Sequence, residues 1–195
     1  NKFNKQIGKV SNDSLDQISI LRGDEVKNSK TKITFNIGGP IFYKSDKRYL
    51  IKLENLHYKC KKFIFMFQKE VADRILAKTN EKNYGRLSIF TSWKMDVKKI
   101  QDVQPGSFYP VPKVKSTILE FQPKKNYFKI NDSKNLEYIT SIFFGQKRKM
   151  IKKPLNLIFK NSKKISDKLS LNLSDRPQNL SPLTYFKLCK EFENF

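Results

Sequence analysis

The stretch Phe108-Tyr-Pro-Val-Pro-Lys-Val-Lys-Ser116 is the part of the sequence around which the fold can be built. Its two prolines hold φ at about −65° and push the residues before them into extended conformations, which excludes a helix. The alternating residues Thr117 to Phe121 then indicate a strand. We therefore predict a stiff loop that leads into a strand. Its aromatic residues, Phe108 and Tyr109, either pack into the core or lie exposed, where an aromatic ring can stack on a planar base.

Strand and helix signals alternate on the N-terminal side of this loop. The patterns predict strands at residues 7–10, 31–37, 61–67 and 95–103, and helices at residues 45–58, 68–78 and 84–93. This alternation is typical of an open α/β sheet. Ligands of such sheets bind at the carboxyl ends of the strands. Four residues fall at or just beyond the end of a predicted strand, namely Asp13, Asn36, Gln68 and Phe108.

The strand signals stop at residues 122–126, which look like a linker. Helix patterns follow at residues 136–144, 149–159, 162–169 and 181–192. Ser181 followed by Pro182 is a typical helix start, because Ser caps the first turn and Pro lacks only an amide that would have no partner there. We predict an α/β domain over residues 1–122 and a small all-helical domain over residues 124–195.

The charge of the chain indicates a polyanionic partner. Its 40 Lys and Arg residues against 18 Asp and Glu residues give a net charge of +22, far more than solubility requires. Nucleic acid is favoured over a membrane, because no apolar run approaches the roughly 18 residues of a membrane span. The densest cationic run is either a solvated helix face or a set of phosphate contacts, and we predict the contacts for Lys147, Arg148, Lys149, Lys152 and Lys153.

The cysteines and the histidine indicate neither disulfides nor a metal site. Cys60 and Cys189 lie far apart in the sequence and fit buried thiols in a reducing cytosol. The single His57 has no companions at metal-ligand spacing, so we expect no metal. The chain starts at Asn1 rather than Met, and we expect it to be a fragment whose beginning is missing.

Four stretches, in this order along the chain, share their pattern with a known family. They are Gln68-Lys-Glu-Val-Ala-Asp-Arg-Ile75, Tyr84-Gly-Arg-Leu-Ser88, Phe108–Ser116 and Phe144-Gly-Gln-Lys-Arg-Lys-Met-Ile151. Together they resemble the small-subunit ribosomal RNA adenine dimethyltransferases. The resemblance is strong from about Lys59 to the C-terminus and weak before it.

This resemblance implies both a fold and an activity. The expected fold is the later half of a Rossmann-like, S-adenosylmethionine-dependent methyltransferase sheet, N-terminally incomplete, followed by a helical RNA-binding domain. The expected activity is transfer of methyl groups from S-adenosylmethionine to adenines of small-subunit rRNA in ribosome biogenesis. The expected partner is the immature small ribosomal subunit. The protein is expected to act in the cytoplasm as a monomer, without binding to a membrane.

The resemblance also implies site residues. The family's fourth strand ends in Asn-Leu-Pro followed by Tyr or Phe, and this chain has Asn36-Ile-Gly-Gly-Pro-Ile-Phe-Tyr43, in which the Pro and the aromatic residue are displaced. Asn36 is thus implied to be catalytic and to contact the cofactor. Phe108 and Tyr43, or else Phe42, are implied to hold the target base. Asp13 matches an acidic residue that contacts the adenine amine of the cofactor.

Local patterns leave other interpretations of these residues open. Asp13 also fits a turn residue, and Asn36 fits the start of a glycine-rich turn after a buried strand. Gln68 and Glu70 match positions beside the family's active site, but Glu70 also favours the start of a helix through the helix dipole.

The glycine-rich cofactor loop of the family has no counterpart in the 195 residues. No Gly-x-Gly-x-Gly run occurs, and the Gly38-Gly39 pair follows the wrong strand. We therefore expect the chain alone to bind S-adenosylmethionine weakly or not at all. One alternative is a non-catalytic nucleic-acid-binding relative, as in mitochondrial transcription factors. A second alternative is a macrolide-resistance rRNA methyltransferase, because these enzymes share the Phe-x-Pro-x-Pro-x-Val pattern. The match at Phe144–Ile151 favours the dimethyltransferases over the latter.

Overall fold

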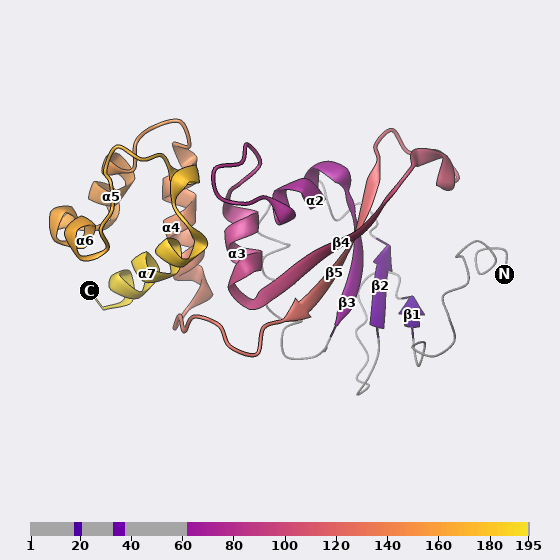
Figure 1. Ribbon diagram of the computed structural model, residues 1–195, viewed down its shortest axis with the longest axis horizontal. Coiled ribbons are helices and arrows are strands. Elements are labelled where there is room, and N and C mark those ends of the chain that lie inside the picture. Colours follow the sequence, from indigo (N-terminus) through magenta and orange to yellow (C-terminus); the bar gives the residue numbers. More distant parts are fainter. Residues whose placement is uncertain (1–17, 21–32, 38–61, 195) are drawn as a thin grey trace.

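The structure is a computed structural model that describes residues 18–20, 33–37 and 62–194 (Figure 1). Within these residues, five strands form one sheet in the order β1-β2-β3-β5-β4. The strands are β1 (Ile18–Ile20), β2 (Ile33–Ile37), β3 (Phe63–Gln68), β4 (Met95–Val103) and β5 (Ser116–Pro123). The strand predicted at residues 7–10 and the helix predicted at residues 45–58 lie outside the described residues.

The sheet contains both parallel and antiparallel strand pairs, and these pairings determine which loops leave the sheet at the same end of the strands. β1, β2 and β3 run parallel, whereas β5 is antiparallel to both β3 and β4. The last residue of β3, Gln68, pairs with the first residue of β5, Ser116. The loop that precedes β5 therefore leaves the sheet at the same edge at which β2 and β3 end.

The apolar run of β3 is explained by its position in the middle of the sheet. Phe65 and Phe67 share one face of the strand, because side chains alternate along it. Their rings pack against the ring of Phe121 on β5, with centroids 5.7 and 5.9 Å away. Phe67 and Phe121 are buried, so aromatic side chains form the core on this face of the sheet.

Two helices cover this part of the sheet, as the sequence predicts. In α2 (Lys69–Leu76), Ala72 and Ile75 are buried. α3 (Arg86–Lys94) is buried on nearly all sides, because it lies between the sheet and the C-terminal helices (Figure 1). A helix in that position needs apolar residues on more than one side, which Leu87, Ile89 and Trp93 supply.

No strand follows Pro123 in the described part of the chain. The C-terminal part consists of α4 (Ser133–Gly145), α5 (Lys152–Ile158), α6 (Ser162–Lys168) and α7 (Pro182–Glu193), with a short 3₁₀ turn at Pro177–Asn179. Asp132 caps α4 by accepting a hydrogen bond from the Lys134 amide at 2.9 Å. Ser181 caps α7 in the same way through Thr184, as its position before Pro182 predicts.

The helix predicted at residues 149–159 begins later, at Lys152. Residues before it form turns, in which the Lys149 amide donates to the Gln146 carbonyl at 2.8 Å. The Ile151 amide donates to the carbonyl of Asp175, also at 2.8 Å, and the Ile151 side chain is fully buried. This long-range hydrogen bond fixes the chain before the helix starts, and local sequence patterns do not show it.

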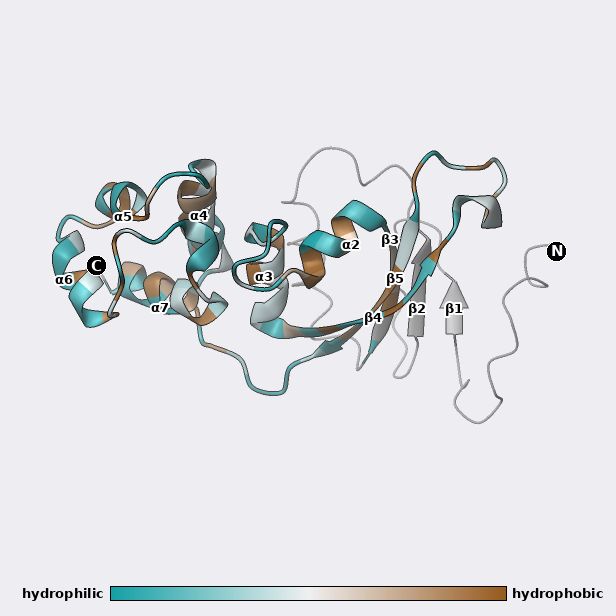
Figure 2. Ribbon diagram, turned by 45° about the horizontal axis from the view of Figure 1, so that its top comes forward, coloured by the Kyte–Doolittle hydropathy of each residue, from teal (hydrophilic) through white to brown (hydrophobic). Residues whose placement is uncertain are grey.

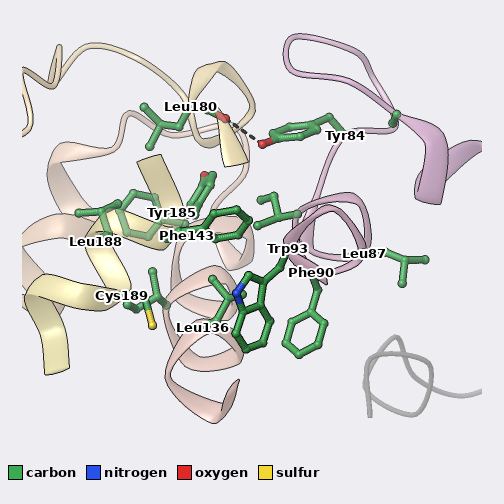
Figure 3. Close-up of a cluster of buried hydrophobic side chains, with 14 of the residues drawn as sticks. Tyr84, Leu87, Phe90, Trp93, Leu136, Phe143, Leu180, Tyr185, Leu188 and Cys189 are labelled. Carbon is green, nitrogen blue, oxygen red and sulfur yellow. Dashed lines mark hydrogen bonds between the residues drawn. The ribbon is translucent and has the colours of Figure 1, made fainter. Parts of the chain in front are cut away.

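The strands and the C-terminal helices share one buried cluster (Figure 3). The hydroxyl of Tyr84 donates to the carbonyl of Leu180 at 2.9 Å, and the indole nitrogen of Trp93 donates to the carbonyl of Phe128 at 2.7 Å. The described strands all precede the C-terminal helices in the sequence, but the side chains of both parts form one continuous core. The division into two domains at residues 122–124 stays a prediction.

Cys189 lies in this core as a free thiol on α7 (Figure 3). Burial raises the pKa of its thiol to about 12, so the group is a neutral packing residue at physiological pH. The predicted burial is thus confirmed for Cys189, whereas Cys60 lies outside the described residues.

Candidate functional site

One edge of the sheet collects the sequence positions that were predicted to act together. Asn36 pairs with Phe65 and Ile37 with Met66, so β2 ends beside β3 at this edge. The loop that carries Phe108 leaves the sheet there too, next to Gln68. The backbone positions of Asn36, Gln68 and the Phe108 loop are therefore brought together, as expected for a ligand site of an α/β sheet. Asp13, Phe42 and Tyr43 lie outside the described residues.

The loop between β4 and β5, residues 104–115, has a local turn at its start and is anchored to another element at its end. It starts with a 3₁₀ turn at Pro105–Ser107, where the Phe108 amide donates to the Pro105 carbonyl at 3.1 Å. At its other end the Lys115 carbonyl accepts a hydrogen bond of 2.9 Å from the amide of Lys69, the first residue of α2. The loop is thus held against the strand–helix junction of β3 and α2.

A polar cluster fixes the base of this loop, and sequence reasoning missed it. The Thr117 hydroxyl donates to Asp102 at 2.7 Å, and the Lys99 ammonium lies 2.7 Å from the other carboxylate oxygen. Hydrogen bonds from Lys99 and then from Thr117 lower the pKa of Asp102 below its usual value. The partners lie on two paired strands, so only the register of β4 against β5 could have revealed the cluster.

The structure treats the two aromatic residues of the loop differently. Phe108 is half-buried, whereas Tyr109 is 95% exposed. The two interpretations that the sequence left open, packing and exposure, therefore apply to different residues. Phe108 is partly shielded from solvent, whereas Tyr109 projects into it.

Glu70 acts as a helix-surface residue in this structure. Its carboxylate accepts a hydrogen bond of 2.6 Å from Arg74, one turn further along α2, and both side chains are largely exposed. Such i,i+4 pairs support a helix by a few tenths of a kcal/mol, about 0.2–0.5. The geometry thus favours the helix-stabilising interpretation of Glu70.

The cationic run of residues 147–153 divides into one engaged lysine and an exposed group. The Lys147 ammonium donates to the carbonyls of Lys82 and Tyr84, at 2.7 and 2.9 Å. Partial burial, and then the nearby Arg74, lower the pKa of Lys147. The other four side chains are exposed, namely Arg148, Lys149, Lys152 and Lys153. Lys147 therefore ties the cationic run to the loop before α3, a role that the charge pattern did not predict.

Replacing Lys147 tests this structural role. Lys147→Ala leaves two carbonyls without their charged donor, and we expect the free energy of unfolding to fall by about 1–2 kcal/mol. Lys149→Ala, which removes an exposed cation two residues away, is expected to change it by less than about 0.5 kcal/mol. Urea melts of the two variants measure the difference, and equal stabilities would contradict a structural Lys147.

The described residues contain no glycine-rich turn after a parallel strand. Their three glycines, Gly85, Gly106 and Gly145, lie at the start of α3, in the β4–β5 loop and at the end of α4, none of them after a parallel strand. Within the described residues, no group of three or more His, Cys, Asp or Glu side chains could hold a metal ion. No described helix is long and apolar enough to span a membrane.

Solved structures define the class of fold. A dimethyladenosine transferase from Plasmodium falciparum matches 87% of this chain and 70% of its own, with a TM-score of 0.69 and 25% identity. The 23S rRNA methyltransferase ErmE matches 86% of this chain and 67% of its own, with a TM-score of 0.56 and 14% identity, which supports the fold alone. The fold is therefore that of the Rossmann-like methyltransferases with a helical C-terminal part, as predicted.

Sequence comparisons define the family. The family model described as ribosomal RNA adenine dimethylase matches residues 8–194. A ribosomal RNA small subunit methyltransferase A from Prochlorococcus marinus (strain AS9601) is 35% identical over 97% of this chain and 68% of its own length. The chain belongs to the ribosomal RNA adenine dimethylase family, which confirms the resemblance stated from the motifs.

The chain is short relative to some of these relatives. The protein of the same description from Pelagibacter ubique is 58% identical over 131 residues, which are 67% of this chain but 50% of the relative. The one from Ehrlichia ruminantium is 46% identical over 61% of this chain and 45% of its own length. The chain thus spans about half to two thirds of the curated relatives that it matches.

Proposed function

We propose that this chain methylates adenines of small-subunit rRNA, with S-adenosylmethionine as the methyl donor. The observation that carries the proposal is the shared edge of the sheet, where the end of β2 with Asn36 lies beside β3 and the Phe108 loop. Membership of the ribosomal RNA adenine dimethylase family supports the same reaction. The immature small subunit in the cytoplasm is the proposed partner, and a monomer is the proposed state.

Two properties of the target amine define what the protein must do. The amine is a weak nucleophile because its lone pair is delocalised into the ring, so the base has to be held in line with the methyl donor. Positive charge develops on the nitrogen, and a fixed acceptor for the amine hydrogens stabilises it. The Asn36 side-chain oxygen is the proposed acceptor, at the end of β2. Asp13 and Asn36 are the proposed contacts to the cofactor, which supplies only the electrophilic methyl group.

The base has to leave its stack to reach this edge, so an aromatic face must receive it. Phe108 is the proposed face, because its loop is anchored beside Gln68 and its ring is half-buried rather than free in solvent. Tyr43 is the proposed second aromatic contact. An anchored ring loses little entropy when the base arrives, which favours binding.

The C-terminal helices supply the proposed RNA-binding surface. The exposed cations of the run 147–153 are Arg148, Lys149, Lys152 and Lys153, and the chain as a whole carries +22. Contacts between such side chains and phosphates release counterions, which makes the affinity steeply dependent on salt. Lys147 is proposed to help by holding this run in place, through the carbonyls of Lys82 and Tyr84.

The salt dependence of RNA binding tests this surface. The double variant Arg148→Ala/Lys149→Ala is expected to bind small-subunit rRNA fragments more weakly, with a slope of log K against log salt that is flatter by about 1.4–1.8. The control, Lys78→Ala/Lys187→Ala, removes the same charge from exposed positions elsewhere and should retain the slope. An unchanged slope in the first variant, or equal flattening in both, would contradict specific phosphate contacts by this run.

A further inference from the structure

Among the described residues, the most exposed large hydrophobic side chain belongs to the β4–β5 loop. Tyr109 is 95% exposed, and Val111 and Val114 in the same loop are 63% and 44% exposed. Single exposed apolar residues are ordinary, but three within six residues on an anchored loop are not. The neighbouring Phe108 is half-buried, so of the two adjacent rings only Tyr109 is fully presented to solvent.

The charges around Tyr109 indicate the chemistry of its partner. Lys113 and Lys115 lie in the same loop and are exposed, and residues 104–115 contain no Asp or Glu. The first carboxylate before the loop, Asp102, is held by Lys99 and Thr117. An exposed aromatic ring on a loop that also carries exposed cations and no carboxylate fits a nucleotide, whose base stacks on the ring and whose phosphates contact the ammonium groups.

The loop is rigid enough to act as a platform. Pro105, Pro110 and Pro112 restrict its backbone, and the Lys69 amide fixes its far end at the Lys115 carbonyl. Figure 2 shows the loop extending beyond the sheet as an arm with mixed hydrophilic and hydrophobic residues. A ring on such an arm is presented to solvent at low entropic cost, which is what a stacking contact requires.

We propose that Tyr109 stacks on an unpaired rRNA base next to the target adenine, while Lys113 and Lys115 contact the adjoining phosphates. The inference rests on the proposed function, and it adds a second base contact to the one assigned to Phe108. The occupant is single-stranded, because the stacked bases of a duplex offer no free face to a protruding ring. The contact selects single-stranded substrate and sets the register of the chain on it.

Binding of two RNA probes tests this contact. The probes are a single-stranded oligoribonucleotide of about 10 nucleotides and a duplex of the same length, titrated at fixed salt by fluorescence anisotropy. Tyr109→Ala is expected to weaken single-strand binding by roughly 5- to 150-fold, with duplex binding and the salt slope unchanged. Tyr109→Trp should retain the affinity, because its ring offers a larger face. Lys113→Ala/Lys115→Ala should flatten the single-strand slope by about 1.4.

A matched control is Tyr138→Ala, which removes a partly exposed tyrosine from α4 and should leave single-strand affinity unchanged. Thermal melts show whether each variant is folded, and Tyr109→Ala should melt like the wild type because its side chain packs on little. Unchanged single-strand affinity in Tyr109→Ala, with normal wild-type binding, would overturn only this contact. Equal losses for both probes would overturn it too. Failure of the wild-type chain to bind either probe would overturn the proposed function, and this contact with it.

Discussion

Phe143→Ala is expected to lower the free energy of unfolding by about 3–5 kcal/mol, the cost of a large cavity in a packed core. Phe143 is fully buried on α4, and its ring meets that of Tyr185 on α7 edge to face at 5.5 Å (Figure 3). α4 in turn packs on α3, which covers the sheet. Because the core is continuous, the sheet and the helices are expected to unfold together.

Two probes in one urea titration check this expectation. Fluorescence of Trp93, the single tryptophan, reports on the boundary between sheet and helices, where the indole donates to Phe128. Far-ultraviolet circular dichroism reports on all elements. The control, Leu157→Ala on α5, removes a side chain that is 61% exposed and should cost less than about 0.5 kcal/mol. Separate transitions by the two probes, or a small effect of Phe143→Ala, would contradict a shared core.

Most of the fold could be predicted because its signals are local. The strand predicted at residues 95–103 is β4 with the same bounds, since it is delimited by a helix before it and by Pro105 after it. β3, α2, α3 and the C-terminal helices also follow from periodicity and capping. β1 was not predicted, because three residues, Ile18–Ile20, are too few to show a period.

What could not be predicted depends on contacts between distant residues. The start of α5 is set by the hydrogen bond between Ile151 and Asp175, and the task of Lys147 is set by carbonyls more than 60 positions away. The contrast between Phe108 and Tyr109 depends on how the loop sits on the sheet. For the site, the rule that ligands bind at strand ends predicts Asn36 and Phe108 at one edge, and the described structure has the backbone of Asn36 and the base of the Phe108 loop there. Their chemical roles stay predictions.

Asn36→Ala is expected to lower the rate of methyl transfer by about 10²- to 10³-fold, the usual cost of losing one fixed group that stabilises developing charge. RNA affinity should change little, because the acceptor acts on the amine and not on phosphates. Asn126→Ala, in the exposed linker after β5, is the matched control and should retain the rate. A rate for Asn36→Ala equal to that of the control would assign the chemistry to another group.

Transfer of labelled methyl groups from S-adenosylmethionine to small ribosomal subunits that lack adenine methylation tests the central claim most directly. The cofactor is supplied in large excess, because the sequence lacks the glycine-rich loop and weak cofactor binding is expected. The account predicts label in N6-methylated adenines of the small-subunit rRNA with the wild-type chain and its near loss with Asn36→Ala. Salt-sensitive binding of the same rRNA without any label in its adenines would contradict the account, and would identify the chain as a non-catalytic RNA-binding relative.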